Sequence, residues 1–348
     1  MSTIAVNAIT DANDGNTTTI NGVTPNSANV VGKNLVINGA MQIAQRGASF
    51  TADNVYTLDR WKSADGTGGT PARTTTQETF SLGQTDVPNA RYYLKHNQTG
   101  ASTNGNAKLQ QKIEDVTRFD GTTVTFSFYA KADSPLTVDV RLIQNFGTGG
   151  SPSTSVTVTE TGISIGTSWN KYTVTKTLGS LSGKTLGTDG EHTSYLDVIV
   201  DFKETSTFIF EATLFQLEKG LSATEFEHRP YGMELSLCQR YCYIPADGSI
   251  TSGGVIATGA AYTSGNNNTP LYPKVTMRAV PTLTQNTGSG YYVYYYNATS
   301  SSTSSLTLSG ASTNDCIMLY SGASTATGAA LDLRMSNANA KLILSAEL

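Results

Sequence analysis

Apolar and polar side chains alternate along several short segments, and this period of two is the feature that most constrains the fold. Residues 124–130 (VTFSFYA) place Val, Phe, Phe and Ala on one face of an extended chain and Thr, Ser and Tyr on the other. Residues 136–142 and 196–202 repeat the pattern. Because successive side chains of a strand point to opposite faces, these segments predict β-strands with one buried face.

Residues 207–217 (TFIFEATLFQL) differ, because they are apolar on both faces for part of their length, as expected of a central strand. No helical period in this part of the chain is long enough for a crossover between parallel strands. We therefore predict an all-β fold, a β-sandwich of two sheets, with a jelly roll as the simplest version.

The composition supports this fold class and excludes others. The 348 residues include 52 Thr, 34 Ser and 33 Gly, and only 14% are charged, against about 25% in an average soluble domain. The 38% of hydrophobic residues argues against a disordered chain. A net charge of -4 without a Lys/Arg cluster argues against a nucleic-acid partner. Neither a secretory signal nor a run of about 18 apolar residues is present, so we expect synthesis in a cytoplasm and no membrane insertion.

Residues 1–32 contain few apolar residues and are rich in Asn, Thr and Gly, which predicts an extended N-terminal arm without a hydrophobic core of its own. Such an arm becomes ordered only against a partner. Five apolar positions are the candidates for that contact: Ile4, Val6, Ile9, Ile20 and Val23.

The remaining chain divides into a sandwich (33–230), a short connector helix (231–243) and a smaller C-terminal β domain (244–348). The helix is predicted from a stripe of Met233, Leu237, Cys238 and Tyr241 at helical spacing. A helix of about ten residues is marginal alone, so this stripe packs on the sandwich or meets its copies on a symmetry axis. In the C-terminal domain, strands are predicted at 271–277, 291–296, 305–308, 315–320, 329–335 and 342–345.

Paired carboxylates would indicate glycoside hydrolysis, which needs two of them about 5 to 10 Å apart. Asp197 and Asp201 share one face of a predicted strand but lie about 13 Å apart. Asp139 or Glu211 could supply the missing neighbour. An ordinary solvated sheet face is the better explanation of these charges, so we predict no catalytic residues and no enzyme.

Metal and cofactor sites are not indicated. His96, His192 and His228 lack ligand spacing, and the three cysteines, Cys238, Cys242 and Cys316, fit small apolar core positions. The acidic loops at 11–14 and at Asp65 leave a structural Ca²⁺ open, but they show no ligand pattern. We predict no cofactor.

Residues 291–296 (YYVYYY) hold five of the 17 tyrosines. Tyrosine combines an apolar ring with a hydroxyl, which suits a buried core or subunit interface and also suits stacking on sugar rings. Both interpretations remain open at this stage. The candidate contact residues are Tyr291, Tyr292, Tyr294, Tyr295 and Tyr296.

Two tryptophans, Trp61 and Trp169, are expected as fully or partly buried anchors of the sandwich. Arg60 precedes the first of them and is expected to pair with a carboxylate such as Asp59 or Glu227.

Several motifs stand at the edges of the middle segment: NLVINGAMQIAQRG at 34–47, YTLDRW at 56–61, QLEKG at 216–220, TEFEHRPYG at 224–232 and LCQRY at 237–241. In these residues the chain resembles phage tail fibre and virion appendage proteins, in particular those of short-tailed marine and cyanobacterial phages. Residues 275–282 (VTMRAVPT) and 344–348 (LSAEL) are similar to the C-terminal part of that group.

The resemblance implies a homotrimeric virion appendage with a jelly roll of the carbohydrate-binding type. Its arm would attach to a tail adaptor or nozzle protein, and its distal part would adhere to a glycan or receptor on the host surface. Its location would be the virion. Two alternatives remain: a tailspike that depolymerises polysaccharide, and a capsid or tail decoration protein without receptor contact.

Overall fold

The computed structural model describes residues 32–64, 72–101, 107–189, 193–203, 205–247, 253–288, 290–297, 299–321 and 326–348. The predicted arm therefore lies outside the described residues apart from residue 32, and so do its five apolar positions, Ile4, Val6, Ile9, Ile20 and Val23. Asp65 and His192 also lie outside them.

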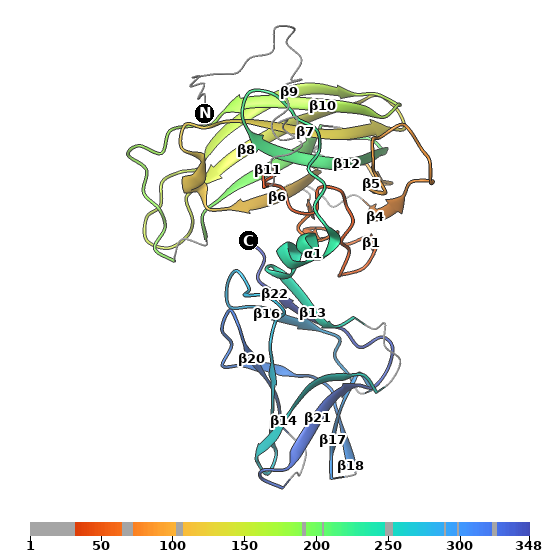
Figure 1. The fold of residues 1–348 in the computed structure, drawn as a ribbon, viewed down its shortest axis with the longest axis vertical. Coiled ribbons are helices and arrows are strands. Elements are labelled where there is room, and N and C mark those ends of the chain that lie inside the picture. Colours follow the sequence, from red (N-terminus) through yellow and green to blue (C-terminus); the bar gives the residue numbers. More distant parts are fainter. Residues whose placement is uncertain are drawn as a thin grey trace, which may run out of the picture.

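The first domain is a sandwich of two antiparallel six-stranded sheets, which confirms the predicted all-β jelly roll (Figure 1). The first sheet has the order β1 (Ser49–Phe50), β4 (Arg73–Thr79), β5 (Tyr92–Gln98), β12 (Phe208–Lys219), β7 (Thr123–Ala132) and β10 (Asn170–Thr177). The second has the order β2 (Val55–Tyr56), β3 (Lys62–Ala64), β6 (Lys108–Glu114), β11 (Tyr195–Phe202), β8 (Leu136–Asn145) and β9 (Val156–Ile165). A 3-10 turn, η2 (Val116–Phe119), links β6 to β7.

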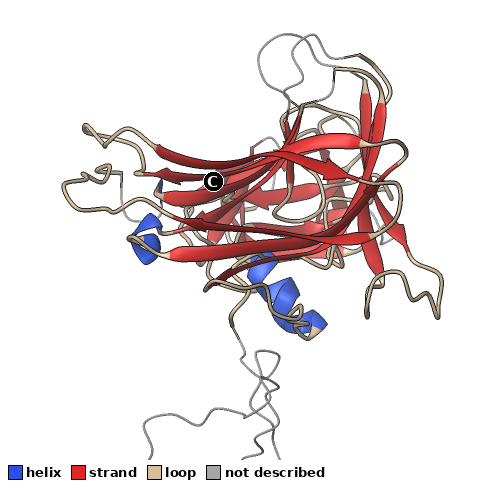
Figure 2. Cartoon of the chain, turned by 90° about the horizontal axis from the view of Figure 1, so that it is seen from above, coloured by secondary structure: helices blue, strands red, loops and turns tan. Residues whose placement is uncertain are grey.

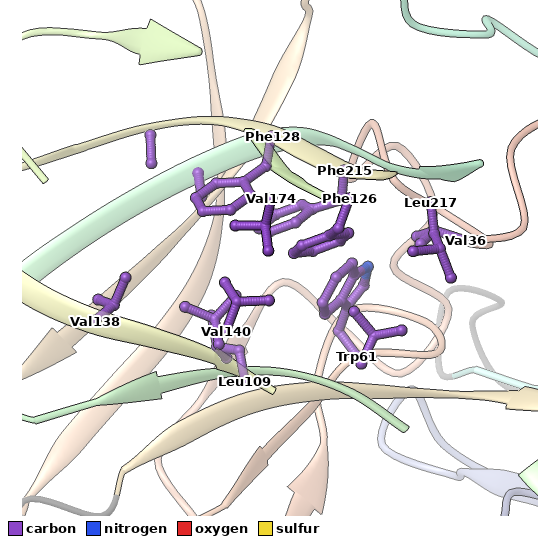
Figure 3. Packing of buried hydrophobic residues seen from close by; sticks show 14 of the residues in the cluster. Val36, Trp61, Leu109, Phe126, Phe128, Val138, Val140, Val174, Phe215 and Leu217 are labelled. Carbon is purple, nitrogen blue, oxygen red and sulfur yellow. The ribbon is translucent and has the colours of Figure 1, made fainter. Parts of the chain in front are cut away.

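The two sheets bury their apolar faces against each other. Seen from above, the strands form layers and the longer helix, α1, lies outside them (Figure 2). Trp61 is fully buried between the sheets, and its ring centroid lies 4.4 Å from that of Phe215 (Figure 3). The inward positions of β7, β8 and β11 are those predicted from alternation, because a period of two leaves only one face of each strand apolar.

A β-bulge in β12 changes which of its residues face the core. Phe210 and Ala212 are buried before the bulge and Phe215 and Leu217 after it, so the inward positions move from even to odd numbers. Leu214 lies between them with φ of 53°, a left-handed conformation that is unusual for leucine. The bulge explains why the sequence of this strand is apolar on both faces.

The chain at residues 34–39 covers the part of β12 that follows the bulge. Phe215 donates its N–H to the carbonyl of Gly39 (3.0 Å), and its own carbonyl accepts from Nδ2 of Asn34 (3.1 Å). Leu35 donates to the carbonyl of Leu217 (2.8 Å). Because buried backbone groups need partners, this segment completes the edge that β5 is too short to cover.

The described residues contain one α-helix, α1 (Tyr231–Gln239), and its buried side contains a carboxylate. Glu234 is 5% exposed, accepts from the backbone N–H of Asn38 and pairs with Arg229. The predicted stripe does not share one environment. Cys238 and Tyr241 are buried, Leu237 is partly exposed and Met233 is 48% exposed, and Tyr241 follows the end of the helix.

The second domain contains a three-stranded and a seven-stranded sheet around one core. The smaller sheet has the order β13 (Cys242–Ala246), β22 (Leu342–Ser345) and β16 (Thr282–Gln285). The larger has the order β18 (Thr299–Thr303), β17 (Tyr292–Tyr296), β21 (Ala330–Met335), β14 (Val255–Thr263), β15 (Asn266–Leu271), β20 (Cys316–Ser321) and β19 (Thr307–Ser309).

The strands predicted at 291–296, 315–320, 329–335 and 342–345 are present with small shifts at their ends, and the one at 305–308 is a short strand two residues later. The strand predicted at 271–277 is wrong, because β15 ends at Leu271. Pro273 follows two residues later and has no N–H to contribute to a ladder.

A buried arginine joins the two domains where the C-terminal end of the chain returns to the sandwich (Figure 1). The guanidinium of Arg60 is paired with Glu347 and donates to the carbonyl of Lys112, and it lies 3.4 Å from the centre of the Tyr241 ring. Arg60 therefore pairs with a carboxylate as predicted, but the two suggested partners, Asp59 and Glu227, are wrong. Its partner is nearly 300 residues away, where no sequence spacing could indicate it.

We predict that Gly39→Ala destabilises the sandwich. A Cβ at this position would lie 2.1 Å from the carbonyl oxygen of Phe215, a backbone atom that cannot move aside. Denaturant unfolding should show a loss of about 2 kcal/mol or more. Gly166→Ala is the matched control, because its Cβ would meet nothing within 4 Å. Equal stability of the two variants would contradict the prediction.

Candidate functional site

Three aromatic rings gather on the outer face of the first sheet, where a sandwich normally exposes polar side chains. Phe80, Tyr93 and Trp169 contact one another with ring centroids 4.7 to 5.5 Å apart. Phe80 is buried beneath, whereas Tyr93 and Trp169 are partly exposed. The ammonium of Lys131 lies 5.6 Å from the Trp169 ring. We refer to Phe80, Tyr93 and Trp169 as the aromatic shelf.

A pocket of about 640 Å³ adjoins the shelf. Tyr129 on β7 and Leu214 in the bulge of β12 pack in the same apolar cluster as the shelf and also line the pocket. The bulge therefore has a second effect, because it places Leu214 on the outer face. The lining residues are Pro88, Asn89, Ser127, Tyr129, Lys171, Leu214, Glu225, Phe226, Glu227, His228, Arg229, Pro230 and Met233.

The charged residues of the pocket wall mostly hold the wall in place. Glu227 accepts from the backbone N–H groups of Gly32 (2.6 Å) and Asn34 (2.7 Å). Arg229 donates to the carbonyl of Val36 (3.1 Å). The ammonium of Lys171 donates to the carbonyl of Thr224 (2.8 Å) and ties the wall to β10.

The polar groups that can serve a ligand are neutral. Tyr129, Ser127 and Asn89 present hydroxyl and amide groups that both donate and accept hydrogen bonds. His228 packs edge-on against Phe226 (4.8 Å), and its partial burial lowers its pKa, which favours the uncharged ring. Aromatic faces beside neutral donors and acceptors suit a ligand with both apolar faces and hydroxyl groups.

Of the four carboxylates considered for hydrolysis, the structure brings two together, Asp139 and Asp201. Glu211 is on β12 of the first sheet and pairs with Lys131 (2.9 Å), whereas the other three are on β8 and β11 of the second sheet. Asp139 and Asp201 are direct neighbours across these strands, and Lys203 bridges them at 3.4 and 2.8 Å. Asp197 lies four residues from Asp201 along β11.

Asp197 is nevertheless unusual. It is 8% exposed, and no donor of the described residues reaches its Oδ1. Burial raises its pKa to about 6, although Lys112, Lys108 and Arg141 act in the opposite direction. A raised carboxyl pKa is one requirement for a general acid, and a second carboxylate at hydrolytic spacing is the other.

The tyrosine run divides between core and surface. Tyr292 and Tyr294 are fully buried in the second domain, so neither can contact a ligand. Burial raises the pKa of Tyr292 to about 12, and its hydroxyl donates to the carbonyl of Lys341 (2.6 Å). Tyr295 is 43% exposed, and Tyr291 and Tyr296 are partly exposed.

Sequence reasoning missed the shelf and its pocket, apart from expecting Trp169 as an anchor. The members come from segments as far apart as Phe80 and Phe226, and no spacing relates them. Among the described residues, no group of His, Cys, Asp and Glu could hold a metal ion, and no helix is long and apolar enough to span a membrane.

No known family model matches this chain. No curated protein matches it in sequence either. Among solved structures, a Bacteroides thetaiotaomicron protein proposed to bind sugar is 15% identical, with a TM-score of 0.36, over 54% of this chain and all of that one.

Two further similar structures are an enzymatically active tailspike domain and a carbohydrate-binding module. The former, from tailspike protein 4 of bacteriophage CBA120, is 16% identical over 54% of this chain and 22% of that one, with a TM-score of 0.33. The latter, the family 11 module of Clostridium thermocellum in complex with a β-1,3-1,4-mixed-linked tetrasaccharide, is 14% identical over 52% and 99%, with a TM-score of 0.29.

We predict that Asp197→Asn stabilises the protein at neutral pH. The pKa of Asp197 is about 6 in the folded chain and 3.8 as the ordinary value, so the folded state favours the protonated acid. The stability that protonation contributes is present below pH 4 and is lost as the pH rises through 6. The free energy of unfolding of the variant should exceed that of the natural chain by up to about 3 kcal/mol at pH 7 and should equal it near pH 3.5.

Urea unfolding at pH 3.5, 5, 6 and 7 measures this difference. Asp86→Asn, at an exposed position, is the control for removing one negative charge. A lower stability of Asp197→Asn at pH 7 would contradict the prediction.

Proposed function

We propose that the protein binds a saccharide on the outer face of its first sheet, at the aromatic shelf and the adjoining pocket. The observation that carries this proposal is the exposure of Tyr93 and Trp169 beside a pocket of about 640 Å³ with neutral polar groups. A sugar ring has apolar C–H faces for the aromatic rings and hydroxyls for Tyr129, Ser127 and Asn89. Burying such rings on ligand binding offsets the otherwise unfavourable exposure of apolar surface.

The test is glycan binding by the full chain and its variants. An array of bacterial surface polysaccharides identifies the ligand, and titration calorimetry measures its affinity. Trp169→Ala should weaken binding about tenfold, since one aromatic contact contributes about 1 kcal/mol or slightly more. Tyr231→Ala removes an aromatic side chain that is 60% exposed on α1 and should leave the affinity for the glycan unchanged.

Two results would contradict the proposal: no binding to any polysaccharide of the array, and equal affinities of the natural chain and Trp169→Ala. Tyr129→Phe retains the ring and removes only the hydroxyl. It therefore distinguishes loss of a hydrogen bond from loss of folding.

We propose further that binding occurs without cleavage. Asp139 and Asp201 lie side by side, but Lys203 and Arg141 hold them in ion pairs, and Glu211 lies on the other sheet. This supports the proposal, since hydrolysis needs one of two neighbouring carboxyl groups to act as a general acid. Incubation with the bound polysaccharide should release no new reducing ends. Release that depends on Asp197 would instead support the depolymerase alternative.

The biological role that we propose is a phage tail fibre: a trimeric virion appendage that adheres to host glycan. The support is the set of sequence motifs at 34–47, 56–61 and 224–232 and the low charge of a hydroxyl-rich surface. Sedimentation of the full chain should give three times its mass of 36.8 kDa, and a single chain mass would contradict the trimer. Immunogold labelling of virions separates a tail appendage from a capsid decoration protein.

A further inference from the structure

We propose that the outer face of the seven-stranded sheet is a second saccharide-binding surface, for a neutral linear glycan that lies across the strands. It is in the C-terminal domain, on strands β18, β17, β21 and β14. This inference does not rest on the pocket of the sandwich, because it uses none of the same residues.

Four side chains form a row across these strands. Ser300 pairs with Tyr295, Tyr295 with Asp332, and Asp332 with Thr258. Directly opposed residues of antiparallel strands point to the same face, so a hydroxyl, an aromatic ring, a carboxylate and a second hydroxyl stand side by side. Neighbouring strands are about 4.8 Å apart, and the row therefore extends over about 14 Å, which suits a short oligosaccharide.

The row faces away from the core. Ser300, Tyr295 and Thr258 are exposed and Asp332 is partly exposed, whereas Tyr294, the neighbour of Tyr295 in sequence, is fully buried on the other face. The tyrosine ring is thus the large apolar group among small polar ones. Such a surface can stack on a sugar ring and hydrogen-bond its hydroxyls.

Arg334 fixes the central pair. Its guanidinium donates to Oδ2 of Asp332 (2.6 Å) and lies 4.8 Å from the centre of the Tyr295 ring. Among the described residues no donor is bonded to Oδ1 of Asp332, which leaves this oxygen to accept from a ligand hydroxyl. Because the ion pair cancels the charge of both side chains, the row favours a neutral sugar over an acidic one.

A hollow of about 260 Å³ lies beside Tyr295. It is bounded by Tyr296, Asn297 and Asp332 among others. Asn297 is exposed and brings an amide that donates and accepts hydrogen bonds. The hollow gives a place for a single sugar ring beside the centre of the row, while the row itself is open and admits a chain.

Saturation-transfer difference NMR on the full chain tests the proposal with three probes: cellotetraose, laminaritetraose and mannotetraose. We expect transfer to at least one of them in the Trp169→Ala background, where the aromatic shelf lacks one ring and binding at the sandwich is weakened. Adding Tyr295→Ala should weaken this binding about tenfold, whereas Tyr295→Phe should retain most of it because the ring remains. Tyr272→Ala is the matched control, since that tyrosine is 65% exposed elsewhere in the domain.

The outcomes separate the two surfaces. If Trp169→Ala alone abolishes all transfer, or if Tyr295→Ala and Tyr272→Ala behave alike, the second surface is overturned and the sandwich pocket stands. If Tyr295→Ala alone abolishes transfer and Trp169→Ala does not reduce it, the second surface stands and the pocket proposal falls. Transfer to none of the three probes overturns the second surface.

Discussion

The bulge at Leu214 of β12 is the constraint on which the rest of the sandwich depends. It leaves the backbone groups of Phe215 without a neighbour from β5, and the segment at 34–39 satisfies them. It also shifts the residues of β12 that face the core from even to odd numbers, so that apolar side chains before and after the bulge are both buried. The same distortion turns Leu214 outward, where it forms part of the pocket wall. The packing of the core, the pairing of the strand edge and the wall of the pocket thus all depend on this one β-bulge.

Two arginines of the motifs that carry the resemblance, Arg229 and Arg60, make structural contacts between segments that are far apart in the chain. Arg229 and Glu234 link the pocket wall, helix α1 and the segment at 34–39, and Arg60 links the sandwich to Glu347 in the C-terminal domain. Buried charges need this density of partners, because an unpaired one costs several kcal/mol. A carboxylate on the inner side of α1 also explains why the helix exposes Met233.

The two proposed glycan surfaces have different designs. The sandwich offers a pocket between an aromatic shelf and a loop wall, whereas the C-terminal domain offers an open row with one tyrosine at its centre. A pocket favours a particular ring, and an open row favours a chain. Two weak contacts on one molecule raise the overall affinity when both reach the same polysaccharide, and further copies of the chain would add to it.

The sequence by itself determined the class of fold and the faces of the long strands, because alternation of apolar residues is a local signal that burial between two sheets preserves. It also located α1 and five of the ten strands that the structure describes in the C-terminal domain, β17 and β19 to β22. Only the tertiary structure decided the partner of Arg60, the division of the tyrosine run into buried Tyr294 and exposed Tyr295, and the assembly of Phe80, Tyr93 and Trp169 into one shelf. These depend on contacts between residues far apart in the chain, and no periodicity in the sequence encodes which strands become neighbours.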